Sequence, residues 1–237
     1  MKVKLVADGS AKWQRMIKRW GIAFLIGDDV LFDTFGDARV FMSNVRKQKI
    51  NLSKIRHVVI SHDDWDHIAG LWSVLKEHKD LKVYVVPHFK VELKDKIRSF
   101  GVTLVETPEP TMIREGVYTS GELSGGSGRG ILYEQAVVIK EEGGKLGVLT
   151  GCAHPKLPDI LRAVRGHFHQ DINVAIGGFH LKDMELDQIR EIVESLPKLG
   201  VCHVFPLHCT GRLAVKEFKR FYGEHYHRLR EGDSIEV

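Results

Sequence analysis

Four mainly apolar segments of this chain run directly into side chains of the kind that bind metal ions. The segments are residues 57–60, 146–150, 172–176 and 201–207. Continuous apolar runs of this length favour strands that are buried on both faces. In open α/β sheets, ligands gather beyond the carboxyl ends of such strands. Four strand ends with the same arrangement therefore predict one polar site in a layered α/β protein.

Strand and helix patterns alternate along the rest of the chain. Residues 21–27 and 29–35 are predicted strands around a Gly27-Asp28-Asp29 turn, and residues 131–140 are a further strand. Helical periodicity is predicted over residues 37–49, 68–78, 89–100, 158–166, 184–197 and 214–224. No linker or low-complexity segment separates the halves. We expect one α/β domain over residues 1–237, with two sheets packed together and helices outside.

Composition excludes several classes of protein. The 237 residues carry a formal net charge of +4, which is too weak alone to argue for a nucleic-acid partner. No apolar run approaches the ~18 residues of a membrane span, and the N-terminus lacks a signal-peptide core. The three cysteines suggest no disulfide framework. We expect a soluble, cytoplasmic protein with no membrane partner and an oligomeric state that the sequence leaves open.

The densest cluster of metal-type residues is the segment SHDDWDHIAG, residues 61–70. His62 and Asp64 are two residues apart, so in an extended loop they point to the same side. Asp66 and His67 follow at the start of a predicted helix. Imidazole suits zinc and iron, whereas carboxylate suits harder ions or a bridging role. Four donors around a small volume indicate a metal site.

This segment resembles the HxHxDH signature of the metallo-β-lactamase superfamily. The stretches LFDTFGD, GCAHP, GGFHL and PLHCTG are similar to motifs of one branch of it, which includes the archaeal 7,8-dihydropterin-6-ylmethyl-4-(β-D-ribofuranosyl)aminobenzene 5′-phosphate synthase. The resemblance runs from Asp33 to Gly211. It implies a four-layer αββα sandwich of two mixed sheets with outer helices, and a two-metal site between the sheets.

Carried over position by position, the resemblance implies two sets of metal ligands. For the first ion the set contains His62 and His154. For the second ion it contains Asp66, His67 and His208. The expected cofactors are therefore two divalent ions, which would be zinc, iron or manganese.

Two acidic residues complete the resemblance. Asp33, at the end of the VLFDT segment, matches the superfamily's buried acidic motif and is expected to orient the ligand loop. Asp64 replaces the second histidine of the signature. As a ligand, Asp64 would harden the site and favour iron or manganese over zinc. Alternatively, its side chain is too short to reach an ion, and the first site is weakened.

Residues outside the ligand sets have functional and structural interpretations. His180 is expected to donate a proton or to support a ligand, whereas Cys152 and Cys209 are expected to be small buried residues. Residues 10–20, with Trp13 and Arg15, form either a lid over an anionic aromatic substrate or a surface helix. Residues 121–130 hold five glycines and Arg129 and form either an anion cradle or a hairpin loop.

The predicted function is metal-dependent hydrolysis by a dinuclear metal-bound hydroxide, with Asp66 and His180 as the catalytic residues. The expected substrate is a small anionic molecule, either a phosphoester or a pterin-related compound. One alternative is the synthase activity of the branch, which releases diphosphate from a pterin donor. The others are di-iron redox chemistry and a metal-poor binding protein. The lack of an additional nucleic-acid-clamping domain argues against a nuclease.

Overall fold

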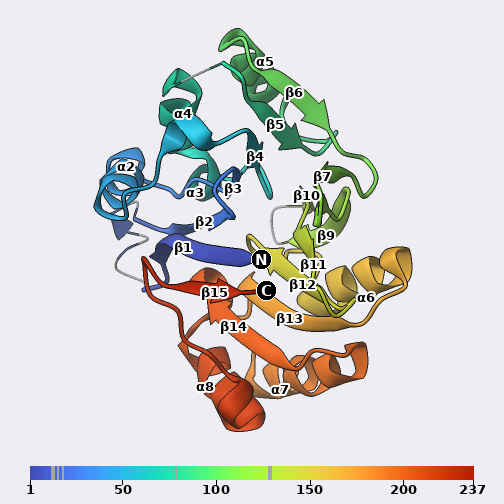
Figure 1. Ribbon diagram of the computed structural model, residues 1–237. Helices are drawn as coiled ribbons and strands as arrows, with labels where there is room; N and C mark the ends of the chain where they lie inside the picture. The colour runs from blue at the N-terminus through green and yellow to red at the C-terminus, as the bar shows by residue number, and fades with distance from the viewer. Residues whose placement is uncertain (12–13, 15, 18, 78, 128–129) are drawn as a thin grey trace.

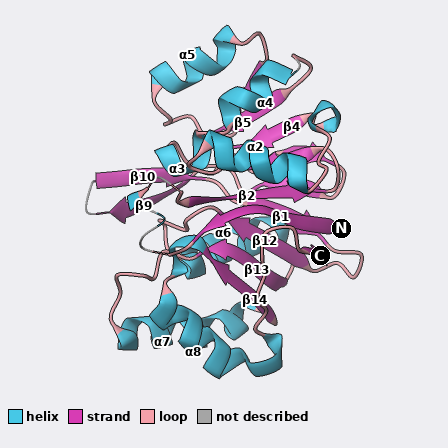
Figure 2. Ribbon diagram, turned by 90° about the vertical axis from the view of Figure 1, so that its left-hand side faces the viewer, coloured by secondary structure: helices cyan, strands magenta, loops and turns pink. Residues whose placement is uncertain are grey.

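Two β-sheets lie face to face, and helices cover their outer faces (Figures 1 and 2). The structure is a computed structural model that describes residues 1–11, 14, 16–17, 19–77, 79–127 and 130–237. Trp13, Arg15 and Arg129 lie outside the described residues, so the lid and the anion cradle predicted on them stay predictions.

The first sheet has seven strands in the order β15-β1-β2-β3-β4-β5-β6. The strand bounds are β1 Lys2–Gly9, β2 Gly21–Ile26, β3 Val30–Phe32, β4 His57–Val59, β5 Lys82–Val85, β6 Thr103–Glu106 and β15 Ser234–Glu236. Strands β1, β2 and β3 pair antiparallel, and the predicted 27–29 turn joins β2 to β3. From β3 to β6 the pairing is parallel. Strands β3 and β4 therefore end at the same edge of the sheet.

The second sheet has six strands in the order β14-β13-β12-β11-β8-β7. The bounds are β7 Met112–Arg114, β8 Val117–Thr119, β11 Val137–Lys140, β12 Leu146–Thr150, β13 Ile172–Gly178 and β14 His203–Leu207. Strands β12, β13 and β14 pair parallel. Their carboxyl ends thus share one edge, as the sequence predicts for the segments before His154, His180 and His208.

Three hydrophobic clusters separate the four layers. The middle cluster lies between the sheets and joins residues such as Phe24 and Phe32 of the first sheet to Ile139 and Ile176 of the second. The outer clusters lie between each sheet and its helices. Over the first sheet these helices are α2 (Ala38–Lys47), α4 (Leu71–Glu77) and α5 (Val91–Ser99). Over the second they are α6 (Leu157–Phe168), α7 (Leu186–Ser195) and α8 (Arg212–Tyr222). The predicted αββα sandwich is confirmed.

Two predicted elements are interrupted in the structure. The predicted helix at 68–78 is replaced by α3 (Trp65–Ile68) and α4, because Ala69 and Gly70 donate their N–H groups to the carbonyls of Phe35 and Thr34. The predicted strand at 131–140 is divided into β10 (Gly130–Glu134) and β11. Strand β10 leaves the second sheet and pairs antiparallel with β9 (Leu123–Ser127).

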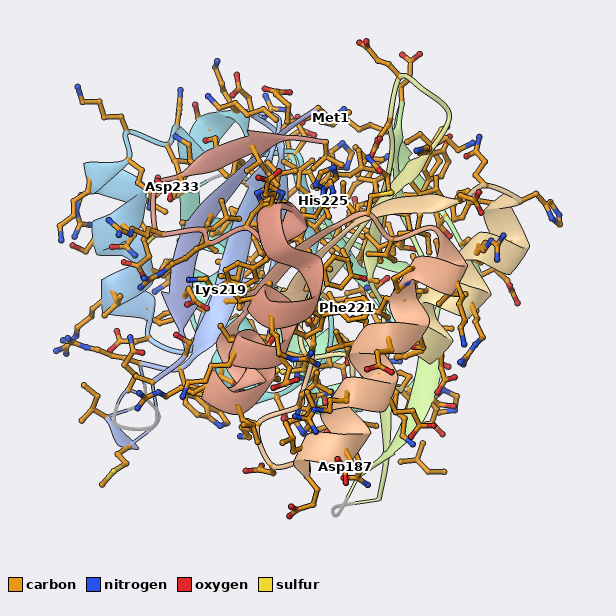
Figure 3. All side chains as sticks on the ribbon, turned by 90° about the horizontal axis from the view of Figure 1, so that it is seen from below. Met1, Asp187, Lys219, Phe221, His225 and Asp233 are labelled. Carbon is orange, nitrogen blue, oxygen red and sulfur yellow. The ribbon has the colours of Figure 1, made fainter. Side chains whose placement is uncertain are left out.

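The C-terminal segment 216–230, which is rich in lysine and arginine, is only partly helical. Helix α8 exposes Lys219 on its outer face, which is seen from below in Figure 3, and it buries Phe218 against the second sheet. The chain then turns at Gly223–His225 and ends in β15, which pairs antiparallel with β1. Among the described helices, none is both long enough and apolar enough to cross a membrane.

Candidate metal centre

The loop after β4 delivers four predicted ligands to the edge where the two sheets meet. His62 and Asp64 lie in the loop, and Asp64 is the N-cap of the short helix α3. Asp66 and His67 occupy the first turn of α3 and are buried. An acidic residue in the first turn is compatible with the positive end of a helix.

Strands of the second sheet bring the remaining predicted ligands to the same place. The donor atoms of His62, Asp64 and His154 lie within 4.8 Å of one another, and so do those of Asp66, His67 and His208. Asp66 Oδ2 lies 3.5 Å from Nε2 of both His67 and His208. These two groups have the composition that the resemblance implies, with Asp64 joining the first group. Their ligand roles stay predictions.

Asp33 holds the imidazole of His67 in place. Its Oδ2 lies 2.6 Å from Nδ1 of His67, and the Ser61 hydroxyl donates to the same oxygen at 2.7 Å. Oδ1 accepts the backbone N–H of Ser61. A carboxylate on the Nδ1 side fixes the tautomer and directs Nε2 outward, which is how metal-binding histidines are usually supported. Asp33 therefore has the position expected of an orienting residue.

Glu134 gives His154 the same support. Its Oε2 lies 2.9 Å from both the Nδ1 and the backbone N of His154, and Oε1 accepts the N–H groups of Cys152 and Ala153. The side chain is buried. Glu134 was not among the predicted site residues, because residues 131–140 were predicted to form one continuous strand. The pair Glu134-Gln135 inside that apolar run was the available signal.

The other two imidazoles are also held through Nδ1. For His62 the contact is with the Ser61 hydroxyl at 2.8 Å. For His208 it is with the backbone carbonyl of Gly9 at 2.9 Å, and Asp8 accepts the His208 backbone N–H. Each of the four imidazoles thus has a partner on Nδ1. Its Nε2 remains available for a metal ion between the grouped side chains.

Two of those Nε2 atoms, in His62 and His208, are buried and have no hydrogen-bond partner among the described residues. An unpartnered buried polar atom costs about 1–3 kcal/mol, so a native protein rarely leaves several together. Metal coordination would satisfy both nitrogens. The residues present therefore fit a centre of two divalent ions.

The electrostatics of the site follow from this packing. Burial lowers the pKa of His62 well below its usual range, and the neighbouring His67 lowers it further. Burial also lowers the pKa of His67, but the Asp33 and Asp66 carboxylates outweigh it and raise that pKa well above its usual range. For Glu134, burial raises the pKa, yet the His154 hydrogen bond and nearby imidazoles leave it lowered. The Glu134 carboxylate therefore remains charged at neutral pH.

Several backbones at the site have a conformation that side chains rarely adopt. Positive φ angles of 57°, 61°, 51° and 47° occur at Asp33, Ala153, His180 and His208. Such conformations cost about 1–3 kcal/mol each and persist where the surrounding structure enforces them, often at functional sites. Close packing also requires a glycine at position 151. A Cβ there would lie 2.1 Å from Ser61 Oγ and 2.9 Å from Asp33 Oδ2.

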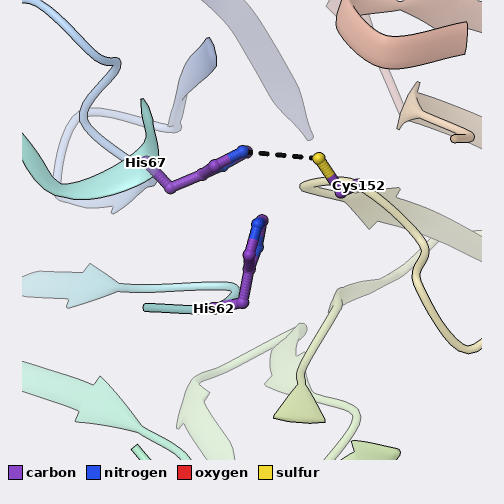
Figure 4. A group of neighbouring side chains, drawn as sticks. All are labelled: His62, His67 and Cys152. Atoms are coloured by element: carbon purple, nitrogen blue, oxygen red, sulfur yellow. Dashed lines mark hydrogen bonds between the residues drawn. The ribbon is translucent and has the colours of Figure 1, made fainter. Parts of the chain in front are cut away.

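A small pocket of about 30 Å³ opens beside the predicted ligands. Its wall includes His180, Cys152 and Cys209, together with Trp20, Trp65 and Lys182. Cys152 Sγ lies 3.5 Å from Nε2 of His67, and Figure 4 shows His62 and His67 pointing toward the same space. The cysteines are buried as expected, but they line the site. The ring of His180 lies 4.6 Å from that of His154.

Comparison with known proteins identifies the family. Residues 28–209 match the model of the beta-lactamase superfamily domain. The chain belongs to the β-lactamase superfamily. The resemblance drawn from its motifs is therefore confirmed.

Similar proteins match nearly the whole chain. A 7,8-dihydropterin-6-methyl-4-(beta-D-ribofuranosyl)-aminobenzene-5'-phosphate synthase of Methanocaldococcus jannaschii is 27% identical, over 91% of this chain and 89% of the relative. A solved metal-dependent hydrolase of the superfamily is 26% identical, with 100% and 99% of the two chains covered and a TM-score of 0.80. The metallo-beta-lactamase fold protein YhfI from Bacillus subtilis is 16% identical, with 99% of each chain covered and a TM-score of 0.70.

Proposed function

We propose that this β-lactamase superfamily member is a metal-dependent hydrolase of small phosphoesters. The observation that best supports this proposal is the grouping of four imidazoles with the carboxylates of Asp64 and Asp66. Each imidazole is held by a contact at Nδ1. When bound, two divalent ions at this centre would lower the pKa of water and neutralise charge that develops on a phosphoryl group.

The protein's own groups have distinct roles in this proposal. Asp33 and Glu134 hold the imidazoles of His67 and His154 at fixed angles, so little reorganisation is needed during the reaction. His180 lies in the pocket wall, and its ring could donate a proton to the leaving oxygen.

The pocket also suggests how the substrate binds. Lys182 brings an ammonium group to the pocket wall, suited to an anionic substrate. Trp65 also lines the pocket and is 42% exposed, so its indole can stack on an aromatic ring. The pocket has room for little more than the reacting group, and the rest of the substrate would lie across Trp65.

The test compares two variants from the same loop. The Asp66→Ala/His67→Ala double variant should lose at least one metal ion per chain and its hydrolysis of an aryl phosphodiester. Asp63→Ala is the control, because Asp63 pairs with the exposed Lys90 and belongs to neither ligand group. Elemental analysis and steady-state kinetics give the readouts. Unchanged metal content in the double variant would refute the proposal that these residues bind metal ions.

A synthase reaction is the second candidate, and the relative from Methanocaldococcus jannaschii favours it. In that reaction the same centre would bind the diphosphate of a dihydropterin donor and assist its departure. Diphosphate release should then require the aminobenzene ribofuranosyl phosphate acceptor and yield a joined product. Release without the acceptor, together with phosphodiester cleavage, supports the hydrolase instead. Chromatography of the products distinguishes the two reactions.

A further inference from the structure

Two cysteines and a histidine from three strand ends form a cluster beside the metal centre. Cys152 follows β12, His180 follows β13 and Cys209 follows β14. Their donor atoms lie within 4.8 Å of one another, and the two sulfur atoms are 3.4 Å apart. Cys152 is 4% exposed and Cys209 is 1% exposed. None of the three belongs to the groups formed around Asp64 and Asp66.

The spacing of the two sulfur atoms suits a shared ion. Two thiolates bound to one tetrahedral zinc ion at ~2.3 Å would lie about 3.8 Å apart. The observed 3.4 Å is a few tenths of an ångström shorter. A disulfide would require an S–S distance of about 2.05 Å, and both cysteines are free.

The histidine of the cluster needs a partner. Nδ1 of His180 is buried and has no hydrogen-bond partner among the described residues. Its backbone is in the left-handed region, with φ of 51°, which a side chain rarely adopts without enforcement. A ligand that reaches Nδ1 would satisfy this atom and explain why the ring is held beside the two thiols.

We propose that Cys152, His180 and Cys209 form a third ligand set, which binds a thiophilic divalent cation such as zinc or cadmium. Thiolates select soft ions, whereas the carboxylate-bearing groups also accept hard ions such as manganese. The sulfur-bearing set therefore differs in metal preference from the other two sets, and manganese does not compete for the sulfur position. Gly178 makes room for the set, because a Cβ there would lie 2.8 Å from Cys209 Sγ.

Cadmium titration of the manganese-loaded protein tests the proposal. A phosphine reductant keeps the thiols reduced, and ultraviolet absorption reports sulfur-to-cadmium charge transfer. The wild-type protein should bind one cadmium ion with this absorption. Cys152→Ser and Cys209→Ser should each weaken that binding at least tenfold. Cys202→Ser is the matched control, because Cys202 is exposed and lies outside the cluster, and it should bind like the wild type.

Two outcomes would overturn the proposal. Loss of the absorption in Cys152→Ser alone would assign Cys152 to the group that it forms with His62 and His67. Unchanged binding in both variants would make the cysteines packing residues. X-ray absorption on cadmium-loaded wild-type protein gives a readout that does not depend on variants. Two sulfur neighbours and a nitrogen support the set, whereas fewer than two sulfurs contradict it. Neither result depends on hydrolysis.

Discussion

The carboxylate of Glu134 holds His154 from two directions. One oxygen lies 2.9 Å from Nδ1 of the imidazole and 2.9 Å from the backbone N of the same residue, while the other accepts the two preceding N–H groups. A single buried side chain from β10 therefore sets both the path of the loop after β12 and the direction of His154 Nε2. This relationship links the departure of β10 from the second sheet to the chemistry of the site.

Replacing Glu134 by glutamine should weaken metal binding about 10- to 100-fold, the usual effect of losing a residue that supports a metal ligand. The glutamine amide has the same shape as the carboxylate. Its NH₂ group, however, cannot accept a hydrogen bond from the N–H groups that now donate to Glu134. Isothermal titration with zinc or manganese after chelation measures the change. Glu122→Gln is the control, because Glu122 bonds to His88 and belongs to no ligand group. Equal affinity in wild type and Glu134→Gln would contradict the supporting role.

Gly151→Ala should destabilise the protein by about 1–3 kcal/mol, the usual cost of overpacking. The new Cβ would overlap the Ser61 hydroxyl and displace it from Asp33. Gly166→Ala provides a matched comparison, because a Cβ at that position in α6 meets nothing within 4 Å. That change should stabilise the protein by about 0.5–1 kcal/mol, since alanine is the better helix former. Denaturant unfolding of both variants measures the two changes in the free energy of unfolding, which should have opposite signs.

Asp64→His should shift metal preference toward zinc. Asp64 Oδ2 lies 3.9 Å from Nε2 of His62 and belongs to the first ligand group. An imidazole there restores the commoner signature and replaces a hard oxygen donor by nitrogen. Activity with manganese or iron should fall relative to activity with zinc. If the order of activity with the different metals is identical before and after the change, Asp64 does not coordinate a metal ion.

The strands that precede the predicted ligands, and the meeting of their ends, were predictable from local patterns. Apolar runs that end in His62, His154 and His208 mark strand ends, and parallel pairing brings such ends together. These signals lie within a few residues of each ligand. The same is true of Asp33, which ends a predicted strand close to the loop that it supports.

Contacts between distant segments were not predictable in this way. Glu134 reaches His154 across 20 residues, and Gly9 contacts His208 across 199. The first contact depends on the departure of β10 from the second sheet, and the second depends on how the two sheets pack. The contact between Cys152 and Cys209 depends on the order of strands in the second sheet, because their 3.4 Å separation joins the ends of β12 and β14, on either side of β13, across 57 residues.

Acidification should destabilise the protein through a histidine cluster that belongs to none of the candidate ligand groups. His203 Nδ1 lies 3.0 Å from His227 Nε2, and His225, labelled in Figure 3, packs on the His203 ring. Burial and neighbouring imidazoles lower the pKa of both His203 and His227. The unfolded chain therefore takes up protons that the folded state does not, and stability falls as pH drops through about 6.5.

The His227→Gln variant should reduce that dependence. Its melting temperature should fall less than that of the wild type between about pH 7.5 and pH 5.5. His167→Gln, on the exposed face of α6, serves as the comparison and should follow the wild type. All three proteins are measured in the same metal state, so contributions from the centre cancel. A wild-type slope in His227→Gln would show that the cluster does not set the acid sensitivity.

Lys182 and Trp65 should determine substrate affinity without holding the metals. Both line the pocket beside the centre, and neither belongs to a ligand group. The Lys182 ammonium lies 5.2 Å from the Trp20 ring centre, which keeps the charge at the pocket wall. Losing one charge contact and one aromatic contact would cost about 2–4 kcal/mol, or roughly 30- to 1000-fold in binding. Trp65→Ala/Lys182→Ala should therefore raise KM strongly toward an aryl phosphodiester while metal content stays unchanged.

A second lysine–tryptophan pair gives the matched control. Lys96 lies 3.8 Å from the ring centre of Trp72, in helices on the outer face of the first sheet. Trp72→Ala/Lys96→Ala removes the same two side-chain types and should lower stability with KM unchanged. Steady-state kinetics on metal-loaded proteins compares the two double variants. If KM stays at the wild-type value in Trp65→Ala/Lys182→Ala, the substrate does not lie across Trp65. If KM rises equally in both, the effect comes from lost stability rather than from the pocket.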